Sequence, residues 1–339
     1  MTRSLRAIPV VIALFAACVG LPGQAQGVGF DLTRPEIRAF IDEASKRDKL
    51  DRAGVQKILA KAEPQPKIIE LMTRPAEKVS PWWEYRARFM TEQRIAEGAQ
   101  FWRQHREVLE RISLERGVAP EYIVAIIGVE TFYGRITGRF RVLDALMTLA
   151  FDYPPRQDFF RSELENFLLL AKEEEVDPLK ALGSYAGAMG APQFMPSSYR
   201  NFAVDGGADG KRNLFKDWDD VFASIANYFR EHGWQTGAPV LAETILDPDP
   251  VFQIDPRNLD LNETIGSLTN KGVRASVAMP ADTKAVLISA EQQDGPAYRI
   301  GFNNFYVITR YNRSVRYGMA VHDLAQAVSA RVHGSAPAP

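Results

Sequence analysis

The chain has 339 residues, of which 46% are hydrophobic and 24% are charged, and its formal net charge is −1. This composition is typical of a globular protein with one to three domains, and it excludes collagen-like and disordered chains. Because positive and negative residues are mixed along the chain without a basic stripe, we expect no nucleic acid partner.

The first 26 residues have the pattern of an export signal. Arg3 and Arg6 precede an apolar run over Ile8–Val19 that is too short to cross a bilayer as a mature helix. The small residues at 23–25 offer a cleavage site. We therefore expect a periplasmic protein.

Cys18 is the only cysteine, so the mature chain is predicted to have no internal disulfide and no thiolate metal site. The segment Phe15–Cys18 resembles a bacterial lipobox, in which the cysteine carries a lipid, although Phe15 stands where Leu is usual. Two interpretations stay open: a lipoprotein anchored in the outer membrane through Cys18, and an ordinary signal that is cleaved near Gln26.

Hydrophobic periodicity predicts a mainly α, α+β fold. Helices are predicted from Pro35 onward and around 55–59, 91–116, 158–174, 218–232 and 319–332, with a Pro-containing linker at 62–67. Runs of β-branched and aromatic residues predict short strands at 239–245, 284–290, 297–302 and 305–310, with a loop at 247–256. We therefore expect a small antiparallel β insertion in a helical protein.

The segment 119–134 is the first that suggests chemistry. Pro120 suits the first turn of a helix and Gly134 its end, and Glu130 falls on the same stripe as three isoleucines. An apolar setting disfavours a carboxylate anion and raises its pKa, as a general acid requires. The alternative is that Glu130 only reaches solvent or caps a neighbour at the helix end.

Two later segments have compositions that suit a sugar cleft. The segment 183–199 begins with small residues and then places the amide of Gln193 beside Phe194 and Met195. The segment 303–318 is rich in Tyr and Asn, which stack on sugar rings and bind hydroxyl groups. Close packing of a loop explains the first segment equally well, and ordinary strand ends also carry such Tyr and Asn clusters.

Taken together, these segments resemble the lytic murein transglycosylase B family. The resemblance runs from about Phe30 to Val332 and depends on motifs in a fixed order: Gly128–Gly134, Ser184–Gly190, Pro192–Tyr199, Ala226–Phe229, Asn304–Tyr306 and Arg310–Asn312. It implies a lysozyme-like helical core with an extra N-terminal helical region and a small β domain. The domains expected are an export signal (1–26), an N-terminal helical region (28–80), a catalytic core (81–238), a β domain (239–300), a C-terminal part returning to the core (301–332) and a disordered tail (333–339).

The resemblance also implies a reaction and a site. Glu130 would protonate the glycosidic oxygen between N-acetylmuramic acid and N-acetylglucosamine, and then take the proton of the muramic C6 hydroxyl, which closes on C1 as a 1,6-anhydro sugar. The substrate-binding residues implied are Ser184, Gln193, Phe194, Tyr85, Tyr228, Tyr311, Asn312 and Tyr317. Peptidoglycan glycan strands are the expected partner, with peptidoglycan synthases as further candidates. We expect a monomer that requires no cofactor.

The segment 205–213 resembles a shortened EF-hand loop, and some members of the family carry calcium here. Asp205, Asp209 and the Lys211 carbonyl fit the ligand positions, with Asp220 or, in another alignment, Asp219 as a later acid. Gly207 stands where a third oxygen ligand is usual. A structural calcium ion is one interpretation, and a Gly/Asp turn held by its own hydrogen bonds is the other.

Two other functions compete with the lyase. A hydrolytic muramidase normally needs a second carboxylate to activate water, and Asp144, Asp152 and Asp158 are available in the sequence. A non-catalytic peptidoglycan-binding protein would keep the aromatic and amide residues without needing Glu130.

Overall fold

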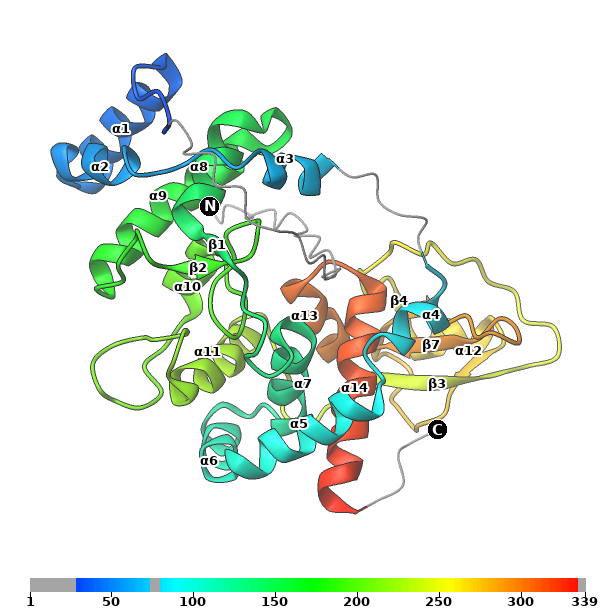
Figure 1. The fold of residues 1–339 in the computed structure, drawn as a ribbon. Coiled ribbons are helices and arrows are strands. Elements are labelled where there is room, and N and C mark those ends of the chain that lie inside the picture. Colours follow the sequence, from blue (N-terminus) through cyan, green and yellow to red (C-terminus); the bar gives the residue numbers. More distant parts are fainter. Residues whose placement is uncertain (1–28, 74–79, 335–339) are drawn as a thin grey trace. The chain divides into compact units, whose positions relative to one another are not determined.

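The computed structural model describes residues 29–73 and 80–334 (Figure 1). The predicted export signal, including Cys18, and the last residues of the predicted tail lie outside this range. Most described elements are helices, and the strands are short and antiparallel, which confirms the predicted fold class. None of the described helices is both long and apolar enough to span a bilayer.

The described residues form two compact units, each built from separate stretches of the chain. We call residues 80–129 and 226–334 unit 1, and residues 29–73 and 130–225 unit 2. The division falls within two helices, α7 (Pro120–Thr131) and α11 (Trp218–Glu231). The domain boundaries expected from the sequence stay a prediction.

Unit 2 consists of helices and one short two-stranded antiparallel sheet. Its elements are α1 (Pro35–Asp48), α2 (Arg52–Leu59), α3 (Pro66–Thr73), β1 (Phe140–Arg141), α8 (Val142–Asp152), η1 (Pro154–Arg156), α9 (Gln157–Glu173), β2 (Leu182–Gly183) and α10 (Pro196–Phe202). The first ten residues of α8 are all buried, and α9 lies beside it (Figure 1). A helix that is buried and mostly apolar on all sides must be enclosed by the rest of its unit, so α8 forms the centre of this unit.

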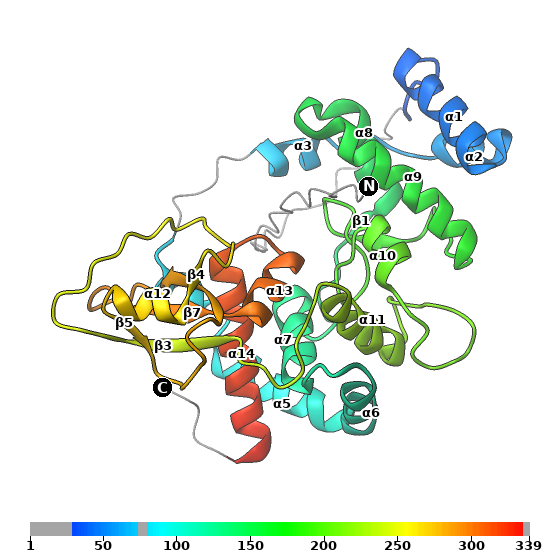
Figure 2. The same cartoon turned by 180° about the vertical axis from the view of Figure 1, so that it is seen from behind.

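Unit 1 combines helices with a five-stranded antiparallel sheet of order β4-β6-β7-β3-β5 (Figure 2). Its helices are α4 (Trp82–Ala87), α5 (Glu92–Gln104), α6 (Arg106–Arg116), α12 (Ile265–Asn270), α13 (Asn303–Tyr311) and α14 (Val315–His333). Its strands are β3 (Leu241–Leu246), β4 (Glu263–Thr264), β5 (Val273–Ala275), β6 (Lys284–Ser289) and β7 (Tyr298–Gly301). The long helix α14 packs against α5, α4 and α13.

The sheet has an apolar core of its own. Ile300 of β7 lies opposite Ala242 of β3 and Leu287 of β6, and all three are buried together with Leu268 of α12 and Val273 of β5. Alternation places these side chains on one face of the sheet. Three of the predicted strands are confirmed, as is the loop at 247–256.

Two predicted elements are wrong. The run 305–310 lies within helix α13 and not in a strand, because Asn304, Phe305 and Ile308 are buried on one helical face and that burial outweighs β propensity. The single helix predicted over 91–116 is two helices, α5 and α6, which meet at the non-helical His105. No Gly or Pro marks that break in the sequence.

Candidate active site

Glu130 lies in the last turn of helix α7, which begins at Pro120 as predicted. The three isoleucines of its predicted stripe are fully buried, and the other residues over 122–128 are buried as well. Glu130 itself is only partly buried. The helix is therefore enclosed along its middle and brings one carboxylate to the edge of the core.

The chain leaves α7 through a strained turn directly after Glu130. Phe132, Tyr133 and Gly134 all have left-handed backbones, with φ of 50°, 60° and 82°. Each non-glycine residue in this conformation costs about 1–3 kcal/mol, and such strain is concentrated at functional sites. Thr131 holds the turn, because its hydroxyl accepts from the Gly134 N–H at 3.1 Å and donates to the Ala191 carbonyl at 2.9 Å. Sequence reasoning did not single out Thr131, although it follows Glu130 in the motif.

Ser184 lies in a tight loop of the same unit and is 8% exposed. Its hydroxyl oxygen accepts hydrogen bonds from the backbone N–H groups of Ala188 at 3.0 Å and Ala186 at 3.2 Å. Both bonds use the oxygen as acceptor. The hydroxyl proton is therefore left to donate to a ligand.

In Gln193 the donor atom is the one that is bound within the protein, whereas in Ser184 it is the acceptor atom. Its side-chain nitrogen donates to the carbonyls of Thr137 at 3.0 Å and Gly190 at 2.9 Å, which uses both of its protons. No described residue donates to its Oε1, and this oxygen is left to accept. The backbone of Gln193 is left-handed, with φ of 53°, so a third strained non-glycine residue belongs to the site.

The turn after α7 and the loop over 183–194 are interlocked. A Cβ on Gly138, whose φ is 105°, would lie 2.0 Å from the Gly183 carbonyl oxygen and 2.5 Å from the Ser184 nitrogen. Only glycine fits a left-handed backbone at such a close approach. The structure thus brings the segment after Glu130 together with the loop of Ser184 and Gln193. Phe194 is 2% exposed and pairs through its backbone with Met189, so it supports this loop from within.

The other five predicted cleft residues belong to unit 1. The Tyr228 hydroxyl donates to the Arg310 carbonyl at 2.7 Å, and its ring lies 4.9 Å from that of Tyr311. The Tyr85 ring contacts the Arg316 guanidinium at 5.1 Å. Asn312 and Tyr317, which lie at the end of α13 and in the first turn of α14, are 8% and 2% exposed.

The three aspartates considered as a second catalytic carboxylate all have other partners. Asp144 is buried, accepts from the Glu63 N–H at 2.9 Å and binds Arg141 at 2.7 Å. Asp152 pairs with Arg34 at 2.7 Å. The side chain of Asp158 is fully exposed, and its ion pair with Arg161 at 3.8 Å is long. None of the three is held in an enclosed site in which it could activate water.

The loop at 205–213 is held by carboxylates that accept backbone N–H bonds. Asp205 accepts from the N–H groups of Asp209 at 3.2 Å and Gly210 at 2.7 Å, and Asp209 accepts from that of Lys211 at 2.9 Å. Asp220 is 1% exposed and accepts from Gly206 at 2.7 Å and Asn213 at 2.6 Å, so it joins both ends of the loop. Burial raises the pKa of Asp220.

As a calcium site this loop is incomplete. Calcium takes six to eight oxygen ligands, and Gly207 supplies no side-chain oxygen at the third position. Within the described ranges, no three acidic, His or Cys side chains are close enough together to share a metal ion. Asp205, Asp209 and the Lys211 carbonyl are the oxygens that a bound ion would use first. The calcium ligands stay a prediction.

Comparison with known proteins gives one family for nearly the whole chain. The family model described as transglycosylase SLT domain matches residues 33–326. The membrane-bound lytic murein transglycosylase B of Escherichia coli K12 is 41% identical over 306 residues, which cover 87% of this chain and 83% of that protein.

Solved structures agree with this result. The soluble lytic transglycosylase SltB1 of Pseudomonas aeruginosa is 44% identical, with a TM-score of 0.82 over 89% of this chain and all of that chain. The lytic transglycosylase Slt35 of Escherichia coli is 40% identical in its complex with bulgecin A, with a TM-score of 0.83 over 91% of this chain and 97% of that chain. Slt35 has also been solved in complex with calcium, where the identity is 39% and the TM-score 0.81 over the same shares of the two chains.

Proposed function

This chain belongs to the transglycosylase SLT family and is a peptidoglycan lytic transglycosylase with a lysozyme-like fold, and from this premise we propose that Glu130 is its single catalytic acid and base. The observation that carries the proposal is the position of Glu130. It is a partly buried carboxylate at the end of an enclosed helix, and the strained turn that follows is locked to the loop of Ser184 and Gln193. Strain held by surrounding hydrogen bonds fixes a side chain in place before the substrate arrives.

The proposed reaction needs one carboxyl group in two protonation states. Protonated Glu130 gives its proton to the glycosidic oxygen as the bond from that oxygen to C1 of N-acetylmuramic acid breaks. The substrate's acetamido group stabilises the cationic C1, as in substrate-assisted glycosidases. The Glu130 carboxylate then removes the proton of the C6 hydroxyl, and O6 forms the new bond to C1. No water enters, and Glu130 ends protonated as it began.

Ser184 and Gln193 suit the positioning of an acetamido group. Such a group carries a carbonyl that accepts and an N–H that donates. The Ser184 hydroxyl has a proton to give, and the Gln193 Oε1 has no described donor of its own. The two residues thus offer the complementary donor and acceptor from neighbouring parts of one loop.

The residues of unit 1 are proposed for further sugar contacts. Tyr85, Tyr311 and Asn312 offer rings and an amide, as carbohydrate clefts do. The rings of Tyr228 and Tyr317 are buried, with exposed fractions of 8% and 2%. They would act mainly by supporting neighbouring residues, and only the edge of each ring could contact a sugar.

The test is mass spectrometry of the products that the enzyme releases from purified peptidoglycan. We expect anhydro-muropeptides, lighter by one water than hydrolysed ones, from the wild type and from the control Glu107→Gln, which changes an exposed acid on α6. Glu130→Gln should release none while still binding peptidoglycan. Reducing-end products would make the enzyme a muramidase, and unchanged turnover by Glu130→Gln would remove Glu130 from the mechanism.

We also propose that the protein acts in the periplasm, anchored to the outer membrane by a lipid on Cys18. The support is the sequence of the first 26 residues and the membrane-bound name of the relative from Escherichia coli. The mass of the mature protein tests this proposal. A mature chain that begins near Gln26 would contradict lipid attachment.

For calcium we propose weak binding at 205–213 and a reaction that does not require it. Calorimetry should give a dissociation constant no tighter than millimolar, and a chelator should leave turnover unchanged. Gly207→Asp should tighten binding at least tenfold, because it supplies the missing oxygen where a Cβ has room, 3.8 Å from Asp219. Micromolar binding by the wild type would contradict the ligand argument.

A further inference from the structure

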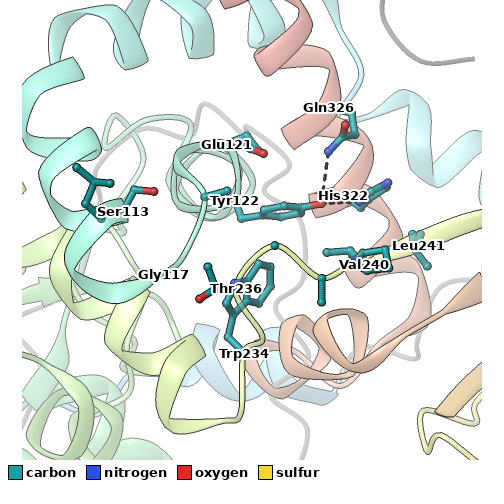
Figure 3. A pocket seen from close by; sticks show the side chains of 15 residues that line it. Ser113, Gly117, Glu121, Tyr122, Trp234, Thr236, Val240, Leu241, His322 and Gln326 are labelled. Atoms are coloured by element: carbon teal, nitrogen blue, oxygen red, sulfur yellow. Dashed lines mark hydrogen bonds between the residues drawn. The ribbon is translucent and has the colours of Figure 1, made fainter. Parts of the chain in front are cut away.

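Unit 1 contains a pocket of about 540 Å³ that the proposed reaction does not use (Figure 3). Its walls come from the end of α6, the first turn of α7, the segment 234–241 and helix α14, all within this unit. Glu121 lines the pocket and precedes Glu130 by nine residues in the sequence. Its volume is within the range of small-molecule sites.

A chain of hydrogen bonds runs along one wall. The Gln326 amide donates to the Tyr122 hydroxyl at 3.4 Å, and that hydroxyl lies 3.0 Å from Nδ1 of His322 (Figure 3). Burial raises the pKa of Tyr122 and lowers the pKa of His322 to about 4, so the phenol keeps its proton and the imidazole is neutral.

We assign the tautomer of His322 from these contacts. The Tyr122 oxygen accepts from Gln326, and the acceptor within reach of its own proton is Nδ1 of His322. His322 therefore carries its proton on Nε2. No described residue bonds to that nitrogen, which leaves an N–H donor at the pocket wall.

Glu121 supplies a carboxylate that can accept hydrogen bonds in the same pocket. Apart from its own backbone N–H, no described group donates to its carboxylate, although burial is large enough to raise its pKa. Among the described residues that line the pocket it is the only acid, and neither Lys nor Arg is present among them. His333 attracts this carboxylate electrostatically, but no described residue binds it through an ion pair or a side-chain hydrogen bond.

The remaining walls are aromatic and apolar. Trp234 and Tyr122 line the pocket with their rings 5.2 Å apart, and Leu114 at its edge is 88% exposed. Aromatic rings beside a carboxylate attract an organic cation, because the ring faces have a negative electrostatic potential and an ionised carboxyl group carries a negative charge. An anionic ligand would be repelled by Glu121, and the described lining offers no Lys or Arg to bind it.

We propose that this pocket binds the ammonium group of a small ligand that also carries an amide or acyl oxygen. Glu121 pairs with the ammonium group, the His322 N–H binds the oxygen, and the apolar body lies against Trp234 and Leu114. A free amine and an amine on a peptidoglycan peptide share this chemistry. The site does not depend on the proposed role of Glu130.

The probes are Nα-acetyl-lysine methylamide, which has a free ammonium group, and Nα,Nε-diacetyl-lysine methylamide, which has none, and neither carries a carboxylate. Binding is followed on the full-length protein by nuclear magnetic resonance, through the indole N–H signal of Trp234, which Trp234→Phe identifies. We expect the free ammonium to bind at least tenfold more tightly. A second experiment compares peptidoglycan fragments before and after acetylation of their amines. If the untreated fragments bind more strongly than the lysine probe, the ligand's amine is that of a peptidoglycan peptide.

Two variants locate the site. Glu121→Gln should weaken binding of the ammonium probe at least fivefold, and Thr236→Lys, which places a competing cation at an exposed wall position, should abolish it. Glu107→Gln and Glu130→Gln should bind as the wild type does. Equal binding of the two probes, unchanged binding by Glu121→Gln, or no shift of the Trp234 signal at 50 mM probe would each overturn the proposal.

Discussion

Thr131→Val is the change that tests most directly how Glu130 is held. Valine has nearly the shape of threonine but lacks the hydroxyl, so two hydrogen bonds are lost at a side chain that is 1% exposed. The Ala191 carbonyl and the Gly134 N–H then lose this partner. A buried polar group left unsatisfied costs about 1–3 kcal/mol, so we expect the free energy of unfolding to fall by about 2–4 kcal/mol.

The same change should slow the reaction. Once the turn after α7 is released from the loop over 183–194, Glu130 and Ser184 are no longer held in one geometry. A small misplacement of a catalytic group lowers turnover by roughly tenfold to a hundredfold. Thr131→Ser keeps the hydroxyl and should retain most turnover and stability.

The assay measures urea unfolding and the release of anhydro-muropeptides for the same preparations. Thr148→Val is the matched control, because it removes a buried hydroxyl that binds the Gln65 N–H at 3.0 Å on α8. It should lose stability but not turnover. If Thr131→Val lost less than about 0.5 kcal/mol and retained full turnover, the reasoning about the strained turn would be refuted.

Three further predictions follow from buried contacts. Gly138→Ala should abolish turnover, because its Cβ would displace Gly183, and normal product release would contradict the close approach. Asp323→Asn removes one of the two carboxylates that the buried Arg299 binds at 2.7 Å and leaves it with the half-exposed Glu243 alone, so the free energy of unfolding should fall by about 1–3 kcal/mol in urea titration, and a loss below about 0.5 kcal/mol would contradict this. Burial raises the pKa of Glu163 above its ordinary 4.5, so the folded state holds the proton more tightly and stability should fall as pH rises through the raised value. Glu163→Gln should flatten that part of the stability profile measured by thermal unfolding, and an unchanged slope would show that the group does not titrate there.

The sequence predicted the elements whose signals are local. Pro35 and Pro120 begin helices α1 and α7, and Gly134 has the left-handed backbone expected where a helix ends. Helix α13 was missed because its run of aromatic and β-branched residues is typical of a strand. Its helical form depends on the burial of Asn304, whose amide binds Gln235 and Ala238 far away in the sequence.

The candidate site was predictable as a set of residues but not as an arrangement. The motifs identified Glu130, Ser184 and Gln193, yet no pattern in the sequence indicated which side-chain atoms would be left for a ligand. That depends on backbone carbonyls such as those of Thr137 and Gly190, which every residue has. Thr131 was overlooked for the same reason, since its role comes from a partner sixty residues away.

The packing of α14 against α5 also has a consequence for biosynthesis. Both helices belong to unit 1, but α14 begins about 210 residues after α5 ends. At about 5–20 residues per second, the ribosome releases α14 roughly 10–40 s after α5. During that interval unit 1 lacks its longest helix and cannot complete its core, so this unit stays incompletely folded until α14 has been synthesised.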